Sequence, residues 1–191
     1  MLLPFWQVEL RAFSIHFLEP IMASTDTSTT NSAKATKSVF PRVQQSSDHD
    51  CAYACIATLT GKSLEEIYQV AIDKFGQPEH GPFWISEELI AKLCASFGLV
   101  ASVYKPVENG TGDLSDVAIV MADYSEVTEL GRHLVFVRDR TDPKRPIEYL
   151  IDPAYWVAEA LWIRNDFKKV AISWAISVHP MANPANVGGK K

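Results

Sequence analysis

The spacing of hydrophobic positions changes from helical to extended near residue 98. Between residues 50 and 98, apolar side chains recur three and four positions apart in successive segments, and a glycine closes each segment. This periodicity is typical of helices that bury one face, and glycines are typical helix ends. Asp50, Ser63 and Ser86 are the predicted N-caps of these segments, and Ser63 and Glu66 also have the spacing of a capping box. The sequence therefore predicts helices within residues 50–61, 63–76 and 86–98.

Beyond residue 98, short runs rich in apolar and β-branched residues predict strands. Two of these runs, 132–139 and 148–153, are joined by a turn rich in Asp, Pro and charged residues, which predicts a hairpin. Helices that precede antiparallel strands along the chain indicate an α+β domain. The runs that predict strands are residues 99–106, 117–123, 132–139, 148–153 and 168–178.

The two ends of the chain differ in composition from residues 39–180, which are predicted to form the domain. Residues 23–38 are rich in Ser, Thr, Ala and Lys and contain no large apolar residue, which predicts disorder. The segment before them is apolar but interrupted by charges, so it is a poor signal peptide. Residues 1–38 are therefore predicted to be a disordered or mis-annotated extension, with a true start at Met22; a short amphipathic helix that docks on a partner is the alternative. Residues 181–191 are predicted to be a flexible tail.

Composition and charge narrow the class of protein. With 47% hydrophobic and 21% charged residues, the chain has an ordinary globular composition. A net charge of −5 and the absence of a Lys/Arg cluster argue against a nucleic-acid surface. No apolar run reaches the roughly 20 residues that cross a bilayer. The three cysteines do not suggest a disulfide framework, and the five histidines are scattered rather than grouped as in a zinc site. We therefore expect a cytoplasmic protein without a membrane span, metal or other cofactor, with secretion as an effector as the alternative.

Cys51 lies where the first predicted helix begins. A helix start places a thiol at the positive end of the helix dipole, which lowers the thiol pKa, and free N–H groups there can bind an oxyanion. Considered alone, Cys51 is more simply explained as a small apolar residue packed at a helix start. His133 and Asp152 change that balance, because His133 begins one strand of the predicted hairpin and Asp152 ends the other. Strand pairing would bring imidazole and carboxylate together as a base and its orienting group. Alternatively, they are an ordinary strand-edge histidine and a turn-initiating aspartate.

The sequence around the cysteine reads QSSDHDCAYAC, with Gln45 six positions before Cys51. The segment GKSLEEI comes after this stretch, and His133 and Asp152 lie within the segments HLVFV and LIDP. With these motifs, residues 39–178 resemble the papain-like cysteine peptidases of the bacteriocin-processing, or double-glycine leader, peptidase family. The resemblance implies a papain-like fold, in which an N-terminal helical half carries the nucleophile and an antiparallel sheet follows. Peptidase domains of this family are usually fused to membrane segments and an ATPase, whereas here we expect a stand-alone domain.

The resemblance also implies a role for each matching residue. Cys51 would attack a carbonyl carbon, and His133 would take the thiol proton and later protonate the leaving group. Asp152 would hold the imidazole in the useful tautomer. The Gln45 side chain and the Cys51 backbone N–H would form the oxyanion hole. One position departs from the family pattern: Ala52 stands where glycine is usual, and its methyl group, tolerable on a helix, would crowd a substrate backbone.

Other residues near the motif are predicted to be structural. Gln44 and His49 are interpreted as exposed loop residues, with a place in the cleft as the alternative for His49. Cys55 and Cys94 lie on the apolar faces of predicted helices and are interpreted as core residues.

The leading functional hypothesis is a cysteine peptidase that acts on a peptide or protein substrate. The same Cys-His-Asp chemistry also supports deamidation, transamidation or acyl transfer, because all of these pass through a thioester. A third hypothesis is a catalytically inactive papain-like module that binds peptides in its cleft.

Overall fold

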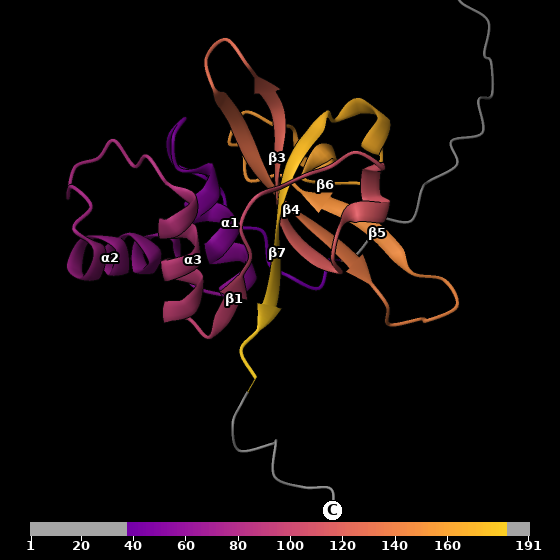
Figure 1. Ribbon diagram of the computed structural model, residues 1–191, viewed down its shortest axis with the longest axis horizontal. Coiled ribbons are helices and arrows are strands. Elements are labelled where there is room, and N and C mark those ends of the chain that lie inside the picture. The colour runs from indigo at the N-terminus through magenta and orange to yellow at the C-terminus, as the bar shows by residue number, and fades with distance from the viewer. Residues whose placement is uncertain (1–37, 183–191) are drawn as a thin grey trace, which may run out of the picture. The chain divides into compact units, whose positions relative to one another are not determined.

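The computed structural model describes residues 38–182, which form three α-helices and an antiparallel sheet (Figure 1). The predicted α+β class is therefore confirmed. The predictions for residues 1–37 and 183–191 fall outside the described part of the chain. No helix within the described residues has the length and apolar character needed to cross a membrane. The helices, which lie together on one side of the sheet in Figure 1, are α1 (Cys51–Thr60), α2 (Leu64–Phe75) and α3 (Glu87–Ser96).

The sheet has the strand order β1-β7-β3-β4-β5-β6, and β2 also pairs with β7. The run predicted at 99–106 is two strands, β1 and β2, which both pair with β7. The predicted hairpin is confirmed as β4 and β5, but β5 ends one residue before Asp152. The strand β6 was not predicted, because a strand of two residues carries no alternation signal. The strands are β1 (Leu99–Ala101), β2 (Lys105–Pro106), β3 (Val117–Ser125), β4 (Leu130–Asp139), β5 (Ile147–Ile151), β6 (Ile163–Arg164) and β7 (Ile172–Pro180), and short 3-10 helices are η1 (Gly110–Asp113), η2 (Glu159–Leu161) and η3 (Phe167–Lys169).

Two of the three helices begin as the sequence predicts. Ser63 and Glu66 form the capping box at the start of α2. At the start of α3, the Ser86 side chain accepts a hydrogen bond from the backbone N–H of Leu89. The start of α1 is different, because Asp50 occupies the N-cap position without making a side-chain cap hydrogen bond.

The helix α1 lacks the polar face that its predicted amphipathic pattern would give it. Nine of its ten residues are buried, because α1 contacts β4 as well as α2 and α3. Ala52, Ala54 and Ala57 are fully buried, and their small side chains let neighbouring elements approach the helix closely. The residue at the start of this helix is therefore fixed against β4.

Side chains of the central strand β4 alternate between two hydrophobic clusters. Val135 and Val137 pack in the cluster that includes the three helices, whereas Leu134 and Phe136 pack in the second cluster. By this alternation, the side chain of His133 lies on the same face of the sheet as that of Val135, which is the face that α1 covers.

Candidate active site

The structure brings Cys51 and His133 together, although they are 82 positions apart in the chain. Cys51 is the first residue of α1, and His133 lies on β4, against which α1 packs. The Cys51 Sγ atom lies 3.2 Å from Nδ1 of His133, and the His133 backbone N–H donates a hydrogen bond to the same sulfur at 3.3 Å. This is the contact that proton transfer between a nucleophile and its base requires.

Burial keeps both partners in their neutral forms. It raises the pKa of the Cys51 thiol, and the backbone N–H groups of His133 and Ala52 offset only part of this effect. Burial also lowers the pKa of His133 from 6.5 to about 4. The low thiol pKa expected from the helix start is therefore wrong, because desolvation of the thiolate outweighs the stabilising N–H groups. At neutral pH the pair is a thiol and a neutral imidazole, and the imidazole is free to act as a base.

Tyr104 is a residue of this site that the sequence did not reveal. Its Oη atom lies 2.5 Å from Nε2 of His133, so the imidazole contacts Cys51 through one ring nitrogen and Tyr104 through the other. Burial raises the pKa of the Tyr104 phenol, which therefore stays protonated at neutral pH. No local pattern marks Tyr104, because its position depends on the pairing of β1 and β2, the strands on either side of it, with the distant strand β7.

Asp152 is fully buried, but within the described residues no hydrogen bond joins it to His133. Its carboxylate accepts hydrogen bonds from Nη1 of Arg132 at 2.5 Å and from the backbone N–H of Ala154 at 3.0 Å. Asp152 therefore does not form the expected pair with the His133 imidazole, and Arg132 binds its carboxylate instead. The reason lies in β4: Arg132 and His133 are consecutive residues, so their side chains leave the strand on opposite faces.

A second buried carboxylate, Asp50, organises the loop before α1. Asp50 accepts hydrogen bonds from the backbone N–H groups of Ser46 and Ser47, from the Ser46 hydroxyl and from the Tyr68 hydroxyl. Its side chain thus turns back to the loop instead of capping the helix as predicted. Gln45 begins this loop and is only 2% exposed, and its Nε2 donates to the Ser47 carbonyl oxygen at 2.7 Å.

Cys51 and His133 line a cleft of about 370 Å³. At this cleft, Trp84 is half exposed and stacks on His49, with 4.4 Å between the ring centroids. The lining is apolar and acidic, and the described residues that form it include no Lys or Arg. Gln45 does not belong to the described lining of this cleft. The lining residues are Asp48, His49, Cys51, Trp84, Ile85, Tyr104, Met121, Glu129, Leu130, Gly131 and His133.

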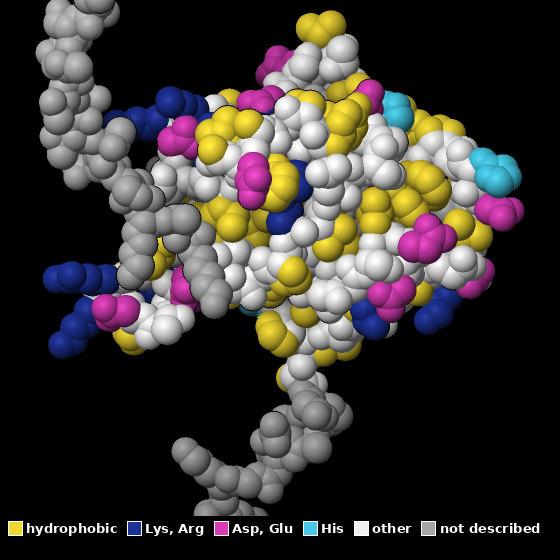
Figure 2. Space-filling view, turned by 180° about the vertical axis from the view of Figure 1, so that it is seen from behind, with side chains coloured by type: hydrophobic (Ala, Val, Ile, Leu, Met, Phe, Trp, Pro, Cys, Tyr) yellow, Lys and Arg dark blue, Asp and Glu magenta, His cyan; other side chains and the backbone are white. Residues whose placement is uncertain are grey.

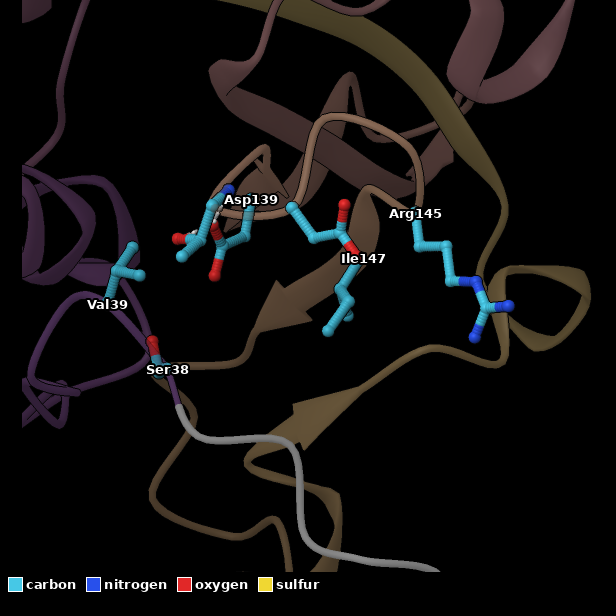
Figure 3. A pocket seen from close by; sticks show the side chains of 7 residues that line it. Ser38, Val39, Asp139, Arg145 and Ile147 are labelled. Atoms are coloured by element: carbon cyan, nitrogen blue, oxygen red, sulfur yellow. Dashed lines mark hydrogen bonds between the residues drawn. The ribbon is translucent and has the colours of Figure 1, made fainter.

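A larger hollow, of about 650 Å³, lies between the segment before α1 and the β4–β5 connection (Figure 3). Ser38 and Val39 line it from one segment, and Asp139, Arg145 and Ile147 line it from the other. The described residues that form it include no cysteine or histidine. The smaller cleft is therefore the better candidate for chemistry.

The remaining residues near the motif have structural positions. Cys55 and Cys94 are fully buried in the core, as predicted, and burial raises the pKa of both thiols, that of Cys94 to about 12. Gln44 is exposed, as predicted, and His49 is both exposed and part of the cleft lining. Ala52 is fully buried in the core, so the prediction that its methyl group would crowd a substrate is wrong.

Neither a metal-binding cluster among the described residues nor, on the face shown in Figure 2, a basic patch is found. Within residues 38–182, no group of three or more His, Cys, Asp or Glu side chains is arranged to hold a metal ion. On the face shown in Figure 2, acidic, basic and apolar side chains of the described residues are interspersed, without one dominant patch of Lys and Arg.

Comparison with known proteins gives a distant similarity in structure. No protein-family model matches the chain, and no curated protein matches it. Among solved structures, the chain is similar to a double-glycine motif protease from an AMS/PCAT transporter, in complex with the leader peptide. The two are 15% identical, with a TM-score of 0.48, and the similarity covers 74% of this chain and 92% of that chain. At this distance the similarity says nothing about the chemistry of individual residues.

Proposed function

We propose that this protein is a papain-like cysteine peptidase in which Cys51 is the nucleophile and His133 is its base. The observation that carries the proposal is the 3.2 Å contact between Cys51 Sγ and His133 Nδ1 at a cleft. The arrangement of elements supports it: a buried helix begins with the cysteine and packs on the strand of an antiparallel sheet that carries the histidine. A cleft beside the pair gives a peptide access to the sulfur.

In the proposed reaction, Nδ1 of His133 accepts the Cys51 proton as the sulfur attacks the carbonyl carbon of a peptide bond. A C–S bond forms, and the carbonyl π electrons move onto the oxygen. When the tetrahedral intermediate collapses, the C–N bond breaks and the imidazolium protonates the leaving amine. One water molecule then hydrolyses the thioester, with His133 again as the base, and the free thiol returns.

The start of α1 is the proposed site for the oxyanion. The first turn of a helix leaves backbone N–H groups without partners in the helix, and those of Cys51 and Ala52 are close enough to the thiol to lower its pKa. Gln45 is proposed as a side-chain donor. Its amide nitrogen carries two hydrogens; one is bound to the Ser47 carbonyl oxygen, and the other is proposed to serve the oxyanion. Asp50 accepts hydrogen bonds from the Ser46 and Ser47 backbone N–H groups and so fixes the loop that runs from Gln45 to the start of α1.

Asp152 is proposed to support this loop rather than the imidazole. Its carboxylate holds Arg132 and the backbone N–H of Ala154. Pro153 lies between Asp152 and Ala154 in the chain, and its carbonyl oxygen accepts a hydrogen bond from the Gln45 backbone N–H at 2.9 Å. A change at Asp152 would therefore reach the oxyanion loop through the main chain.

Cleavage of a peptide library, followed by mass spectrometry, tests the proposal. We expect new peptide termini with the wild type and with the matched control Cys94→Ala, and none with Cys51→Ala. Conversion of glutamine to glutamate without new termini would replace the peptidase with a deamidase. Peptide binding that survives Cys51→Ala, without any product, would indicate an inactive module.

Thiol labelling gives an independent measurement. A thiol-directed electrophile should label Cys51, which lines the cleft, faster than Cys55 or Cys94, which are fully buried. Equal and slow labelling of all three thiols would contradict the proposed nucleophile.

A further inference from the structure

We propose that Tyr104 is the positioning residue for His133: its phenol oxygen accepts the Nε2–H hydrogen bond and holds the tautomer whose bare Nδ1 takes the Cys51 proton. This inference rests on the proposed function, because it assigns a partner to the proposed base. It gives Tyr104 the role that the sequence had suggested for Asp152.

The geometry around the imidazole selects the tautomer. The His133 ring lies 3.2 Å from the Cys51 sulfur through Nδ1 and 2.5 Å from the Tyr104 hydroxyl through Nε2. A neutral imidazole carries one hydrogen, on one of these two nitrogens. Nδ1 must be bare to accept the thiol proton, so the hydrogen belongs on Nε2, where the Tyr104 oxygen is the acceptor within reach.

The position of Tyr104 is fixed by contacts on both sides of the chain. Its backbone N–H donates to Oε2 of Glu87, the first residue of α3, at 2.6 Å. Two residues earlier, the Ser102 backbone N–H donates to a carbonyl oxygen of β7 at 2.9 Å, and the following residue, Lys105, pairs with the same strand. A hydroxyl held in this way can set the orientation of the His133 ring.

No competing acceptor for Nε2 comes from Asp152. Its carboxylate is engaged by Arg132 at 2.5 Å and by the Ala154 backbone N–H at 3.0 Å. Arg132 is also tied to Asp123 at 2.7 Å. Release of Asp152 toward His133 would therefore require the arginine to leave a site where two carboxylates hold it.

A phenol partner makes this base different from one that is backed by a carboxylate. Hydrogen bonds to a charged acceptor are about twice as strong as neutral ones, so a phenol oxygen stabilises the imidazolium less. The neutral pair of thiol and imidazole is then favoured over a thiolate and an imidazolium, in agreement with a His133 pKa of about 4. The thiol of Cys51 is expected to lose its proton during attack on the substrate and not before it.

Several ionisable groups share the cleft with the His133 ring, and the experiment must separate their effects from that of the Tyr104 hydroxyl. Besides Cys51 on α1, they are Asp48 and His49 in the loop before α1 and Glu129 before β4. A substitution that removes only the hydroxyl leaves all of these groups in place.

Tyr104→Phe makes that change, and Tyr149→Phe is the matched control, since its hydroxyl accepts a hydrogen bond from the Val39 backbone N–H at 3.0 Å, outside the cleft. Nitrogen-15 NMR of labelled histidines reports the His133 tautomer, and alkylation of Cys51 by iodoacetamide reports its reactivity against pH. We expect the Nε2–H tautomer in the wild type and in Tyr149→Phe, and a mixture of tautomers in Tyr104→Phe. Alkylation of Cys51 at neutral pH should fall about fivefold in Tyr104→Phe, as expected for the loss of one hydrogen bond.

Two results would overturn the inference. One is a wild-type His133 with its hydrogen on Nδ1, which needs no variant to detect. The other is a tautomer and an alkylation profile that change in Asp152→Asn but not in Tyr104→Phe. Peptide cleavage separates this inference from the proposed function. A protein that cleaves no peptide but shows a Tyr104-dependent tautomer contradicts only the peptidase, and a peptidase whose tautomer ignores Tyr104 contradicts only the inference.

Discussion

Replacement of Arg132 by methionine should destabilise the protein much more than loss of an exposed ion pair. Arg132 Nη1 lies 2.5 Å from Asp152, whose side chain is fully buried, and 23% of the arginine side chain is exposed. In Arg132→Met, the Ala154 backbone N–H is the one hydrogen-bond partner that the buried carboxylate keeps within residues 38–182. Removal of one partner from a buried pair typically costs about 3–5 kcal/mol, and solvent screening of the partly exposed arginine favours the lower end, about 3 kcal/mol. This is a large part of the about 5–15 kcal/mol that stabilises a typical domain.

Urea unfolding measures this free energy, and Arg140→Met is the matched control. Arg140 lies 2.7 Å from Asp116, but these side chains are 53% and 49% exposed, so its loss should cost at most about 1 kcal/mol. Addition of Asp152→Asn to Arg132→Met should recover part of the lost stability, because no unpaired charge then remains buried. Equal losses in Arg132→Met and Arg140→Met, or no recovery in the double variant, would refute the reasoning.

The structure supports further predictions on pH, substrate charge and packing. Because burial lowers the pKa of His133 from 6.5 to about 4, the unfolded chain binds the proton more readily between these values. The free energy of unfolding should therefore fall by about 3 kcal/mol as pH drops from 6.5 to 4. Urea unfolding of His133→Phe should show a flatter pH dependence, and an unchanged pH dependence in this variant would show that His133 is not its cause. Asp48 and Glu129 line the cleft, and the described lining includes no Lys or Arg, so peptides with Lys or Arg near the cleaved bond should have the lower KM, with an advantage that shrinks as salt is added. Glu129→Gln should reduce this advantage, and peptide kinetics that do not depend on charge would rule the idea out. A Cβ at Gly131 would lie 2.7 Å from Cγ of Met121, so Gly131→Ala should cost about 1–3 kcal/mol in urea unfolding, and a loss within error would show that Met121 moves aside freely.

The sequence predicted the parts of the fold that depend on local patterns. Helix starts at Ser63 and Ser86 follow from side-chain capping, which acts within one turn. The hairpin of β4 and β5 follows from two apolar runs and a short turn. The complete burial of α1 did not follow, because it depends on three different elements that surround one helix.

The candidate site was only partly predictable for the same reason. The order of Cys51 and His133 suggested a nucleophile and a base, and the structure places them in contact. The partner of the imidazole could not be read from spacing, because Asp152 lies just beyond its strand and Arg132 draws the carboxylate away. Tyr104 reaches His133 because β1 and β2, on either side of it, pair with the distant strand β7.

Because α1 is buried, the reactivity of its two cysteine thiols reports how far the protein opens. Cys51 is reached through the cleft, whereas Cys55, one turn further along the helix, is fully buried in the core. A reagent can reach Cys55 only when the packing of α1 against the sheet and the other helices is lost, which amounts to cooperative unfolding of the domain. The slow reaction of Cys55 in native conditions would therefore report the opening of the whole domain, and the fast reaction of Cys51 the state of its cleft, in a single labelling experiment.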